Sequence, residues 1–466
     1  MEAKTFVSKK RRGFIMAKRI FALLLALVMV TALFAGCGKN EKATTDNDKT
    51  AEESKSDKSD TTDTQSKEPE PVTIKFIQNS ANGGREDVLK SMIDNFQSKY
   101  PNITVNYEII AYSDYYTKLN TMLSAGTDAP DVFEVGYENF AQYAAKGLLK
   151  DITDIVANDT DFKTENMKKL AYDAYNYNGK QMGICTDFTG CIMYYNKDLF
   201  DSKGLEYPNE NWTWEDELEA ALKLTDASKG IWGTVSPLQV YEFYKTIAQN
   251  GGSIWGADGK TVTVNSKECV EALQWMLDKS YKYKVQPPFT SDIYTQPDAD
   301  WRAFEEGRIA MLRNGTWQFG VFEKNAKCNW DIILEPGNTQ KAHHFFSNGL
   351  VMYKGSKKDE AAWTFMKYMA IDPFVVNTRI EANWNIPVLN DDDVMKAYYE
   401  KTPPEHKKVA TALLDSLVLP PLGPIPEKWA ELQQVLGDEL EKAKYGKVTA
   451  QEALDAAKEK IEKLFE

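Results

Sequence analysis

The pattern of apolar and polar positions after residue 71 predicts alternating strands and helices. Apolar residues at every second position, or in short runs, predict strands over residues 72–77, 103–107 and 129–133. Apolar residues at helical spacing predict helices over residues 85–100 and 115–125. A β-α-β-α-β order is typical of a parallel sheet with helices on its faces, and ligands bind beyond the carboxyl ends of such strands.

The stretch 183–200 contains a polar segment followed by a predicted strand. An apolar strand is expected over residues 191–195, and the polar segment before it holds Asp187 and Thr189. Because such a strand is buried, we expect the loop that precedes it to lie at the entrance of the site that the strand supports. We therefore expect the strand to be the first crossing between two lobes, with Asp187 and Thr189 in a loop that faces a cleft.

The second half of the chain predicts two further crossings, at residues 343–352 and 383–387. Thr213 with Asp216, and Thr449 with Glu452, have the spacing of capping boxes, which begin helices. Trp214, Trp275 and Trp363 lie on helical stripes and are interpreted as packing residues. A short strand is predicted over residues 230–235, a hairpin around 257–260, and helices over residues 214–224, 241–248, 269–278, 301–307, 358–370, 410–419 and 429–444.

The first 71 residues have a different composition. Basic residues precede an uncharged apolar run over residues 20–35, which is the layout of a secretory signal; an uncleaved membrane anchor is the alternative. Ala35 and Gly36 before Cys37 resemble the lipobox of bacterial lipoproteins, although Phe34 stands where Leu is usual; the resemblance implies a lipid on Cys37. Residues 38–71 are mostly charged and small polar, which predicts a disordered tether. Translation could begin at Met1 or at Met16.

Composition restricts the function. A length of 466 residues favours two lobes over one core, and a net charge of −13 argues against nucleic acid as a partner. The 11 Trp and 23 Tyr suit both a core and a site that stacks on a polar ligand. Besides Cys37 the chain has Cys185, Cys191, Cys269 and Cys328; buried thiols are favoured, although export would permit three disulfide pairings.

Several blocks in a fixed order resemble the extracellular solute-binding proteins of ABC importers, the carbohydrate-type family that includes maltose-binding protein. They read REDVLKSMIDNFQSKYPNITV, DYYTKLNTMLSAGTDAPDVF, YAAKGLLKDIT and MYYNKDLF, and later NWTWED and AFEEGRIAM followed by NGTW. The resemblance covers residues 72 to the C-terminus. It implies an α/β, two-lobe, type II periplasmic-binding-protein-like fold with three interlobe crossings.

The resemblance also implies where a ligand binds. By position, the family's ligand loops fall on Asn79, Tyr137, Glu138, Asp187, Thr189, Tyr241 and Trp317, with Asn348 and Trp384 beside crossings. Aromatic platforms and polar edges suit a sugar, which offers C–H faces and many hydroxyls. The sequence does not decide whether Trp255 lies in the cleft or in the core. Cys185 replaces a frequent Pro, and residues 135–137 lack a Trp found in some maltose binders, so the ligand need not be a maltodextrin.

Enzyme signatures are missing from the sequence: it has no G-x-S-x-G, H-E-x-x-H or G-x-x-x-x-G-K-[ST] motif. His343, His344 and His406 are its only histidines, and we interpret them as surface or loop residues. The adjacent pair would point to opposite faces of a strand, which argues against a shared metal. We expect no catalytic residue, no metal and no cofactor.

The expected protein is a lipid-anchored receptor on the extracytoplasmic face of a bacterial membrane. It would be a monomer that captures a sugar or oligosaccharide between its lobes and delivers it to an ABC permease. The alternatives are a secreted glycoside hydrolase using Glu138 and Asp187 as its carboxylate pair, and a surface adhesin or sensor. The expected division is a signal peptide over 1–36, the lipidated Cys37 and tether over 37–71, a first lobe from 72–187 plus 350–383, and a second from 188–349 plus 384–466.

Overall fold

The computed structural model describes residues 70–79, 85–126, 128–384, 386–401, 409, 411–418, 421 and 423–466. All of them belong to one unit of the chain, residues 68–466. The expected signal sequence, the lipidation site Cys37 and His406 lie outside the described residues. Among the described residues, no helix combines the length and the apolar character that a membrane crossing requires.

Three parallel strands open the fold, as the sequence predicts. β1 (Val72–Asn79) pairs in parallel with β2 (Ile103–Ile110) on one side and with β3 (Val132–Gly136) on the other. Helices α2 (Glu86–Lys99) and α3 (Tyr112–Ala125) connect these strands. The carboxyl ends of β1 and β3 therefore lie at the same edge of the sheet, where Asn79 and Gly136 end their strands.

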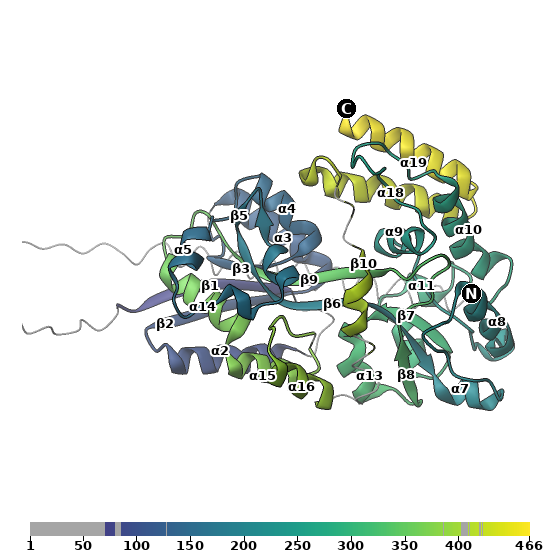
Figure 1. Ribbon diagram of the computed structural model, residues 1–466, viewed down its shortest axis with the longest axis horizontal. Helices are drawn as coiled ribbons and strands as arrows, with labels where there is room; N and C mark the ends of the chain where they lie inside the picture. Colours follow the sequence, from purple (N-terminus) through teal and green to yellow (C-terminus); the bar gives the residue numbers. More distant parts are fainter. Residues whose placement is uncertain are drawn as a thin grey trace, which may run out of the picture. The chain divides into compact units, whose positions relative to one another are not determined.

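Two long strands join this sheet to the second half of the chain (Figure 1). β9 (His343–Met352) pairs antiparallel with β3 and with the first half of β6 (Gly183–Asn196). The second half of β6 pairs with β7 (Met311–Gly315) and β8 (Trp330–Ile333). The result is one sheet of eight strands, in the order β2-β1-β3-β9-β6-β7, with β8 on β6 and β10 (Leu417–Val418) on β9.

The expected loop at Asp187 and Thr189 is wrong: both residues lie inside β6, every residue of which is buried. Pairing with β9 extends the strand back to Gly183, and the only sign of irregularity there is a shift of register between Cys185 and Asp187. The third crossing follows the expectation, because Phe188 and Ile386 exchange backbone hydrogen bonds of 3.1 and 3.0 Å. Three chain segments thus meet at Phe188.

The helices cover the sheet and close the two ends of the fold. Both capping boxes are confirmed, at Thr213 with Asp216 and at Thr449 with Glu452. The larger helices are α4 (Tyr137–Ala145), α8 (Trp214–Leu224), α9 (Val240–Gln249), α10 (Lys267–Tyr281), α14 (Asp359–Ile371), α15 (Pro373–Glu381), α16 (Asp392–Lys401), α18 (Trp429–Lys444) and α19 (Ala450–Phe465). Short elements are α5 (Thr153–Asn158), α6 (Lys169–Asp173), α7 (Lys197–Ser202), α11 (Asp292–Thr295), α12 (Ala299–Glu305), α13 (Phe319–Asn325), a hairpin of β4 (Asn176–Tyr177) with β5 (Lys180–Gln181), and 3₁₀ turns at Thr164–Asn166, Ala227–Lys229, Thr316–Gln318, Leu413–Ser416 and Pro426–Lys428.

Two local predictions differ from the structure. The expected strand over residues 230–235 consists of isolated bridges, in which Trp232 pairs with Ile309 and Val235 with Leu312. In the expected helix over 410–419, the described residues are helical only at Thr411 and Ala412, and they continue as the 3₁₀ turn Leu413–Ser416 and the short strand β10. The apolar pair Leu417–Val418 adds to the edge of β9, and this pairing overrides the local helical pattern.

Apolar side chains form three clusters among the described residues. The largest extends from β1, β3, α2 and α14 to β7 and α13, a second joins α9, α10, α18 and α19, and a third packs β6 against α8. Trp214 stacks on Trp275 at 5.2 Å, and Trp363 is buried, so the packing interpretation of these residues is confirmed. All four described cysteines are free, as favoured, and Cys185 is buried.

We expect Gly349→Ala to destabilise the fold by about 2 to 3 kcal/mol, because a Cβ in a packed sheet overpacks the core. The added carbon would lie 2.3 Å from the ring of Tyr175. That ring cannot withdraw easily, since its hydroxyl donates to the carbonyl of Val135 at 2.9 Å. Urea unfolding measures the loss. Gly256→Ala is the control, because its nearest atoms lie 3.4 Å away, and equal stability of the two variants would contradict the expectation.

Candidate functional site

Four polar side chains meet at the sheet edge where β1, β3, β6 and β9 adjoin. Asn79 donates from Nδ2 to Glu134 Oε1 at 2.5 Å, and Asn348 donates from Nδ2 to Asp187 Oδ1 at 3.1 Å. Thr186 donates to the other Asp187 oxygen at 3.2 Å. Asn79 and Asp187 are buried, whereas Asn348 is half-buried. We name Asn79, Glu134, Asp187, Asn348, Arg85, Arg379 and Trp384 the crossing cluster.

Two arginines, the buried Arg379 and the half-buried Arg85, face the two carboxylates of the crossing cluster. Burial raises the pKa of Glu134 to about 8, with Asp187 acting in the same direction and Arg379 and Arg85 opposing it. Burial also lowers the pKa of Arg85 to about 10, which Asp187 and Glu134 oppose. Above a pH of about 8 the four groups form two opposite pairs, which compensates for the burial of their charges, and below it Glu134 holds its proton.

Arg85 joins segments that are far apart in the sequence. Its Nη2 donates to the carbonyl of Trp384 at 2.9 Å and to the carbonyl of Trp317 at 3.3 Å. Its guanidinium lies 4.8 Å from the ring centroid of Trp384, a cation–π distance. Arg379 lies 5.7 Å from the same ring and donates to the carbonyl of Thr186 at 3.0 Å. Arg85 therefore ties the start of α2 to the third crossing and to the segment after β7.

A group of aromatic rings lies beside β9 on the other side of the crossings. Phe346 is 5.5 Å from Trp317 and 5.7 Å from Tyr241, and Tyr241 is 5.6 Å from His344, measured between ring centroids. Tyr241, Trp317 and Phe346 are half-buried, so each retains an exposed part. We name Tyr241, Trp317, His344 and Phe346 the aromatic cluster. Half-exposed rings in one group are typical of a site that stacks on a ligand.

Tyr137 and Glu138 begin α4, on the side of β3. The ring of Tyr137 lies 5.3 Å from that of Phe345, the residue of β9 between His344 and Phe346. Glu138 Oε2 is buried and has no hydrogen-bond partner among the described residues. Burial raises the pKa of Glu138 to about 7. A buried acceptor without a partner is available for a ligand hydroxyl.

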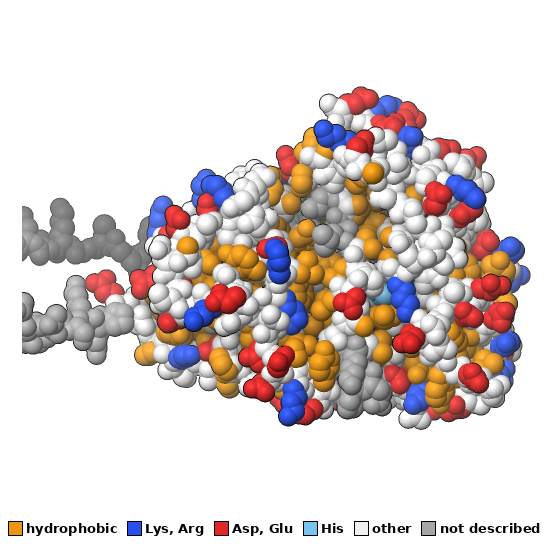
Figure 2. All heavy atoms as spheres, viewed as in Figure 1, with side chains coloured by type: hydrophobic (Ala, Val, Ile, Leu, Met, Phe, Trp, Pro, Cys, Tyr) orange, Lys and Arg blue, Asp and Glu red, His pale blue; other side chains and the backbone are white. Residues whose placement is uncertain are grey.

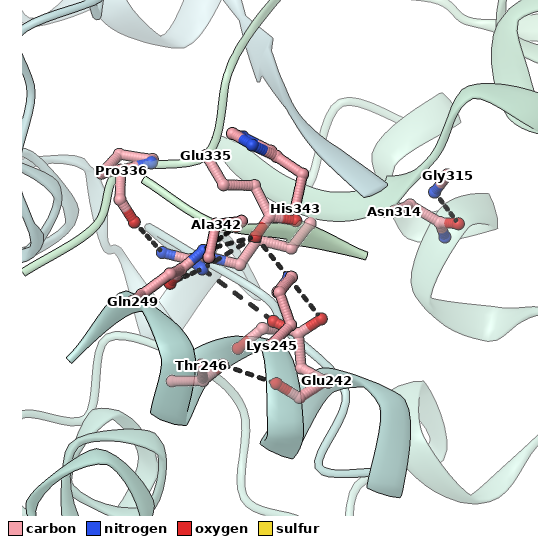
Figure 3. A network of polar contacts seen from close by, with 12 residues as sticks. Glu242, Lys245, Thr246, Gln249, Asn314, Gly315, Glu335, Pro336, Ala342 and His343 are labelled. Carbon is pink, nitrogen blue, oxygen red and sulfur yellow. Dashed lines mark hydrogen bonds and ion pairs between the residues drawn. The ribbon is translucent and has the colours of Figure 1, made fainter. Parts of the chain in front are cut away.

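A second polar network joins α9, β7 and the segment that follows β8 (Figure 3). Arg313 of β7 donates to Glu335 at 3.1 Å and to Gln249 at 3.2 Å, and it pairs with Glu217. Lys245 donates to Glu242 at 2.7 Å and pairs with Glu335. Lys279 lies 3.8 Å from Glu217. Three carboxylates and three cations therefore neutralise one another, each with a side chain at most 2 % exposed.

One group of possible metal donors lies in this network. Ligand atoms of Cys191, Glu242 and Glu335 lie within 4.8 Å of one another. The ammonium group of Lys245 already bonds to both carboxylates, so their charge is compensated without an ion. The network instead fixes α9, on which Tyr241 immediately precedes Glu242, and β7, which leads to Trp317.

The structure brings the predicted residues together in three places. Asn79, Asp187, Asn348 and Trp384 lie in the crossing cluster, and Tyr241 and Trp317 in the aromatic cluster. Tyr137 and Glu138 lie across β9 from the latter, and Thr189 bonds to the hydroxyl of Thr316 at 2.7 Å. Trp255, left open by the sequence, packs against Phe465 at 5.0 Å.

Arg85, Phe346 and Arg379 were missed by sequence reasoning. The rule that ligands bind beyond the carboxyl ends of parallel strands pointed to residues 134–139, but Glu134 was not selected as a site residue. Phe346 could have been found from its place within the expected second crossing. No local pattern distinguishes Arg379, which lies in the last turn of α15.

The interpretation of the histidines as surface or loop residues is wrong for His343 and His344. Both lie in β9 with at most 1 % of their surface exposed. His343 shares a hydrogen bond of 2.8 Å with Ser416, while His344 contacts Tyr244 on the opposite face, so the alternation along the strand is confirmed. Burial lowers the pKa of His343 to about 4. The short strand β10 and helix α9 cover the two histidines, which the sequence alone predicted to be exposed.

Known protein structures have a similar fold. An ABC substrate-binding protein from Listeria monocytogenes in complex with cycloalternan is 40% identical, with a TM-score of 0.79 over 85% of this chain and 99% of that one. A maltose-bound binding protein from T. maritima is 22% identical, with a TM-score of 0.72 over 84% of this chain and 99% of the other, and shows the fold alone. The fold is therefore the two-lobe fold of ABC solute-binding proteins.

The sequence comparisons lead to the family. A putative binding protein of Brucella abortus (strain 2308) is 25% identical over 366 residues, covering 76% of this chain and 83% of that protein. The maltotriose-binding protein of Pyrococcus abyssi is 23% identical over 78% of this chain and 76% of its own length. Residues 82–372 match the family described as bacterial extracellular solute-binding protein, and the chain belongs to that family.

We expect Arg313→Met to destabilise the protein by about 3 to 5 kcal/mol, because removing one partner leaves buried carboxylates without compensation. Glu217 and Glu335 are the carboxylates affected. Urea unfolding of the two proteins at pH 7 measures the change. Lys463→Met is the control, because Lys463 pairs with Glu459 on the surface of α19. A loss no greater than in this control would show that Arg313 does not balance the network.

Glu138 predicts a pH dependence of stability. Its folded pKa of about 7 lies above the ordinary value, so the folded state holds the proton more tightly than the unfolded chain and stability falls as pH rises through about 7. Glu138→Gln removes this loss. Between pH 5 and pH 8 the variant should gain roughly 1 to 2 kcal/mol of unfolding free energy relative to the parent protein.

Urea unfolding at several pH values checks this expectation. The exposed Glu219 of α8 provides the control variant Glu219→Gln, which should follow the parent protein at every pH. Parallel stability curves for the parent and Glu138→Gln would rule out a proton held by Glu138.

Proposed function

We propose that this protein captures a linear or cyclic oligosaccharide of glucose units between its two lobes and delivers it to an ABC permease. The proposal is supported mainly by the aromatic cluster, with Glu138 across β9 from it. Rings of Tyr241, Trp317 and Phe346 would stack on the C–H faces of the sugar units. The unpartnered oxygen of Glu138 would accept a hydrogen bond from a hydroxyl.

Similarity to sugar-binding proteins supports this ligand class. The Listeria protein at 40% identity was solved with cycloalternan. More distant structures contain maltotriose, in a protein from Bdellovibrio bacteriovorus, and maltose. An Arthrobacter globiformis protein binds cyclic α-maltosyl-1,6-maltose. We extend these ligands to the present chain because both kinds of side chain that a sugar needs lie next to β9, the rings on one face and Glu138 on the side of the other.

The proposed mechanism is closure of the lobes around the ligand. A ligand shifts a protein toward the form that it binds more tightly, so a sugar held by both walls favours the closed form. Helix α4, which carries Glu138, contacts α18 and the turn Pro426–Lys428, and Arg85 bonds to the carbonyl of Trp317. These contacts between the two proposed lobes would form on closure and present one surface to the permease.

The bounds of the two lobes and the attachment to the membrane are part of the proposal. The lobes would comprise residues 72–187 plus 350–383, and 188–349 plus 384–466. A signal peptide over residues 1–36 and a lipid on Cys37 would hold a monomer at the extracytoplasmic face of the membrane. These assignments are supported by the order of basic, apolar and small residues before Cys37.

A glycoside hydrolase is less well supported. Its carboxylate pair would be Glu138 and Asp187. Asp187 is only 3% exposed, and its two oxygens accept hydrogen bonds from Asn348 and Thr186. It is therefore engaged in holding β6 and β9, and it would have to leave these partners to act on a sugar.

We expect Trp317→Ala and Tyr241→Ala each to weaken binding of maltotriose at least tenfold, because each removes a stacking surface worth roughly 1.4 kcal/mol or more. Isothermal titration calorimetry measures the affinity. Phe374→Ala is the control, since this ring on α15 is 39% exposed and lies outside the site. Unchanged affinity in both site variants, or failure of the parent protein to bind any linear or cyclic oligosaccharide of glucose, would overturn the proposal.

A further inference from the structure

The carboxyl group of Glu138 folds back over the end of β3. A Cβ on Gly136 would lie 2.9 Å from each of its oxygens, so the carboxyl group occupies the space that this glycine leaves free. Asn139 donates from Nδ2 to Oε1 at 3.4 Å, and Oε2 is buried without a hydrogen-bond partner among the described residues. One oxygen is therefore weakly bonded, and the other is available to a donor.

Two tyrosines of α3 lie beside this carboxyl group. Burial raises the pKa of Tyr112 and of Tyr116, and the charge of Glu138 acts in the same direction, which places both phenols within its electrostatic reach. Tyr116 is also fixed to the end of β3, because its hydroxyl accepts a hydrogen bond of 3.2 Å from the backbone N–H of Gly136. Helices α3 and α4 and strand β3 belong to the same proposed lobe. These contacts are therefore independent of lobe closure.

No cation compensates the charge of Glu138 in the part of the chain that the structure describes. Burial raises its pKa, and the opposing influence is the hydrogen bond from its own backbone N–H. Tyr175 is a third phenol nearby, since the charge of Glu138 helps to raise its pKa. The 3₁₀ turn before α18, and α18 itself, also contact α4. At that end Glu427 and Glu431 are exposed, and Lys428 donates to a backbone carbonyl near the end of α19.

The other ionisable groups on the neighbouring strands have partners of their own. The two histidines of β9, which contacts α4, bond to Ser416 and to Tyr244. Glu134 of β3 faces two arginines, which oppose the rise of its pKa. Among the described carboxyl groups at this edge of the sheet, Glu138 is therefore the one whose charge a ligand would have to compensate.

A donor to Oε2 would change the protonation of Glu138. Burial raises its pKa to about 7, so a large share of the molecules hold this proton at neutral pH. A hydrogen bond donated to an ionised carboxylate is roughly twice as strong as one donated to a neutral acceptor. Apolar side chains gather in the middle of the molecule, between α4 and α9 (Figure 2), and surroundings of low polarity strengthen such a bond. A hydroxyl that donates to Oε2 therefore favours the ionised form.

We propose that binding of a hydroxyl-bearing ligand is coupled to the loss of a proton from Glu138, so that the protein binds its ligand more tightly at alkaline than at acid pH. The inference rests on the proposed function, which places a ligand hydroxyl at Oε2. The O–H bond of the carboxylic acid breaks, its proton passes to water, and the ligand hydroxyl donates to the carboxylate that remains. Affinity is then lost as pH falls through the pKa of the free protein, because the proton competes with the ligand.

Isothermal titration calorimetry with maltotriose between pH 5.5 and pH 8.5 tests the coupling. The affinity of the parent protein should be about tenfold higher at the alkaline end, which is the difference between a charged and a neutral acceptor. At pH 7 the apparent enthalpy should change with the ionisation enthalpy of the buffer, because the buffer takes up the released proton. Glu138→Gln should show neither effect, whereas the exposed control Glu219→Gln should follow the parent protein.

A second measurement needs no variant. Maltotriose added to the parent protein in a weakly buffered solution at pH 7 should acidify that solution, and titration back to the starting pH counts the protons released. If Glu138→Gln does not fold or does not bind, this count decides: no release, or an uptake of protons, would overturn the coupling.

The outcomes separate this inference from the proposed function. Parent affinity that is constant across this pH range, or that rises toward acid pH, would overturn the coupling and leave the proposed function intact. An equal pH dependence in the parent and in Glu138→Gln would do the same. Absence of binding at every pH, by maltotriose and by a cyclic oligosaccharide of glucose, would overturn both.

Discussion

The pairing of β6 with β9 is the interaction on which the other features depend. Backbone hydrogen bonds join them from Gly183 to Gly190, and β6 then continues into its pairing with β7 and β8. The two strands carry or adjoin Asp187, Asn348 and Phe346, so they place the crossing cluster and the aromatic cluster at a fixed separation. A change of register by one residue would turn each of these side chains to the opposite face.

Buried charge stabilises the two ends of this pair in different ways. At the first end, Arg85 and Arg379 face Glu134 and Asp187, and Arg85 reaches two carbonyl groups on other segments. At the second end, the network around Arg313 fixes the helix of Tyr241 and the strand that leads to Trp317. In both places the charges balance within the protein. This allows the half-exposed rings between them to remain available to a neutral ligand.

Membership of the family places this chain among binding proteins. The side chains of the site then determine which sugar it binds. In the proposed site, the aromatic cluster and Glu138 bind the sugar. Tyr241 of the aromatic cluster stands on α9 directly before Glu242 of the buried network. Rigidity beneath that ring reduces the entropy that ligand binding would otherwise cost.

The sequence by itself determined the β-α-β-α-β opening, the capping boxes at Thr213 and Thr449, the three crossings and the family resemblance. These are local patterns of spacing and side-chain type, which neighbouring residues specify directly. Only the tertiary structure decided that Asp187 and Thr189 lie within a strand, because pairing with β9 supplies the hydrogen bonds that a loop would lack. It also decided that His343 and His344 are buried, and that Arg85 meets Trp317 and Trp384, since no local pattern encodes contacts between residues more than 200 positions apart.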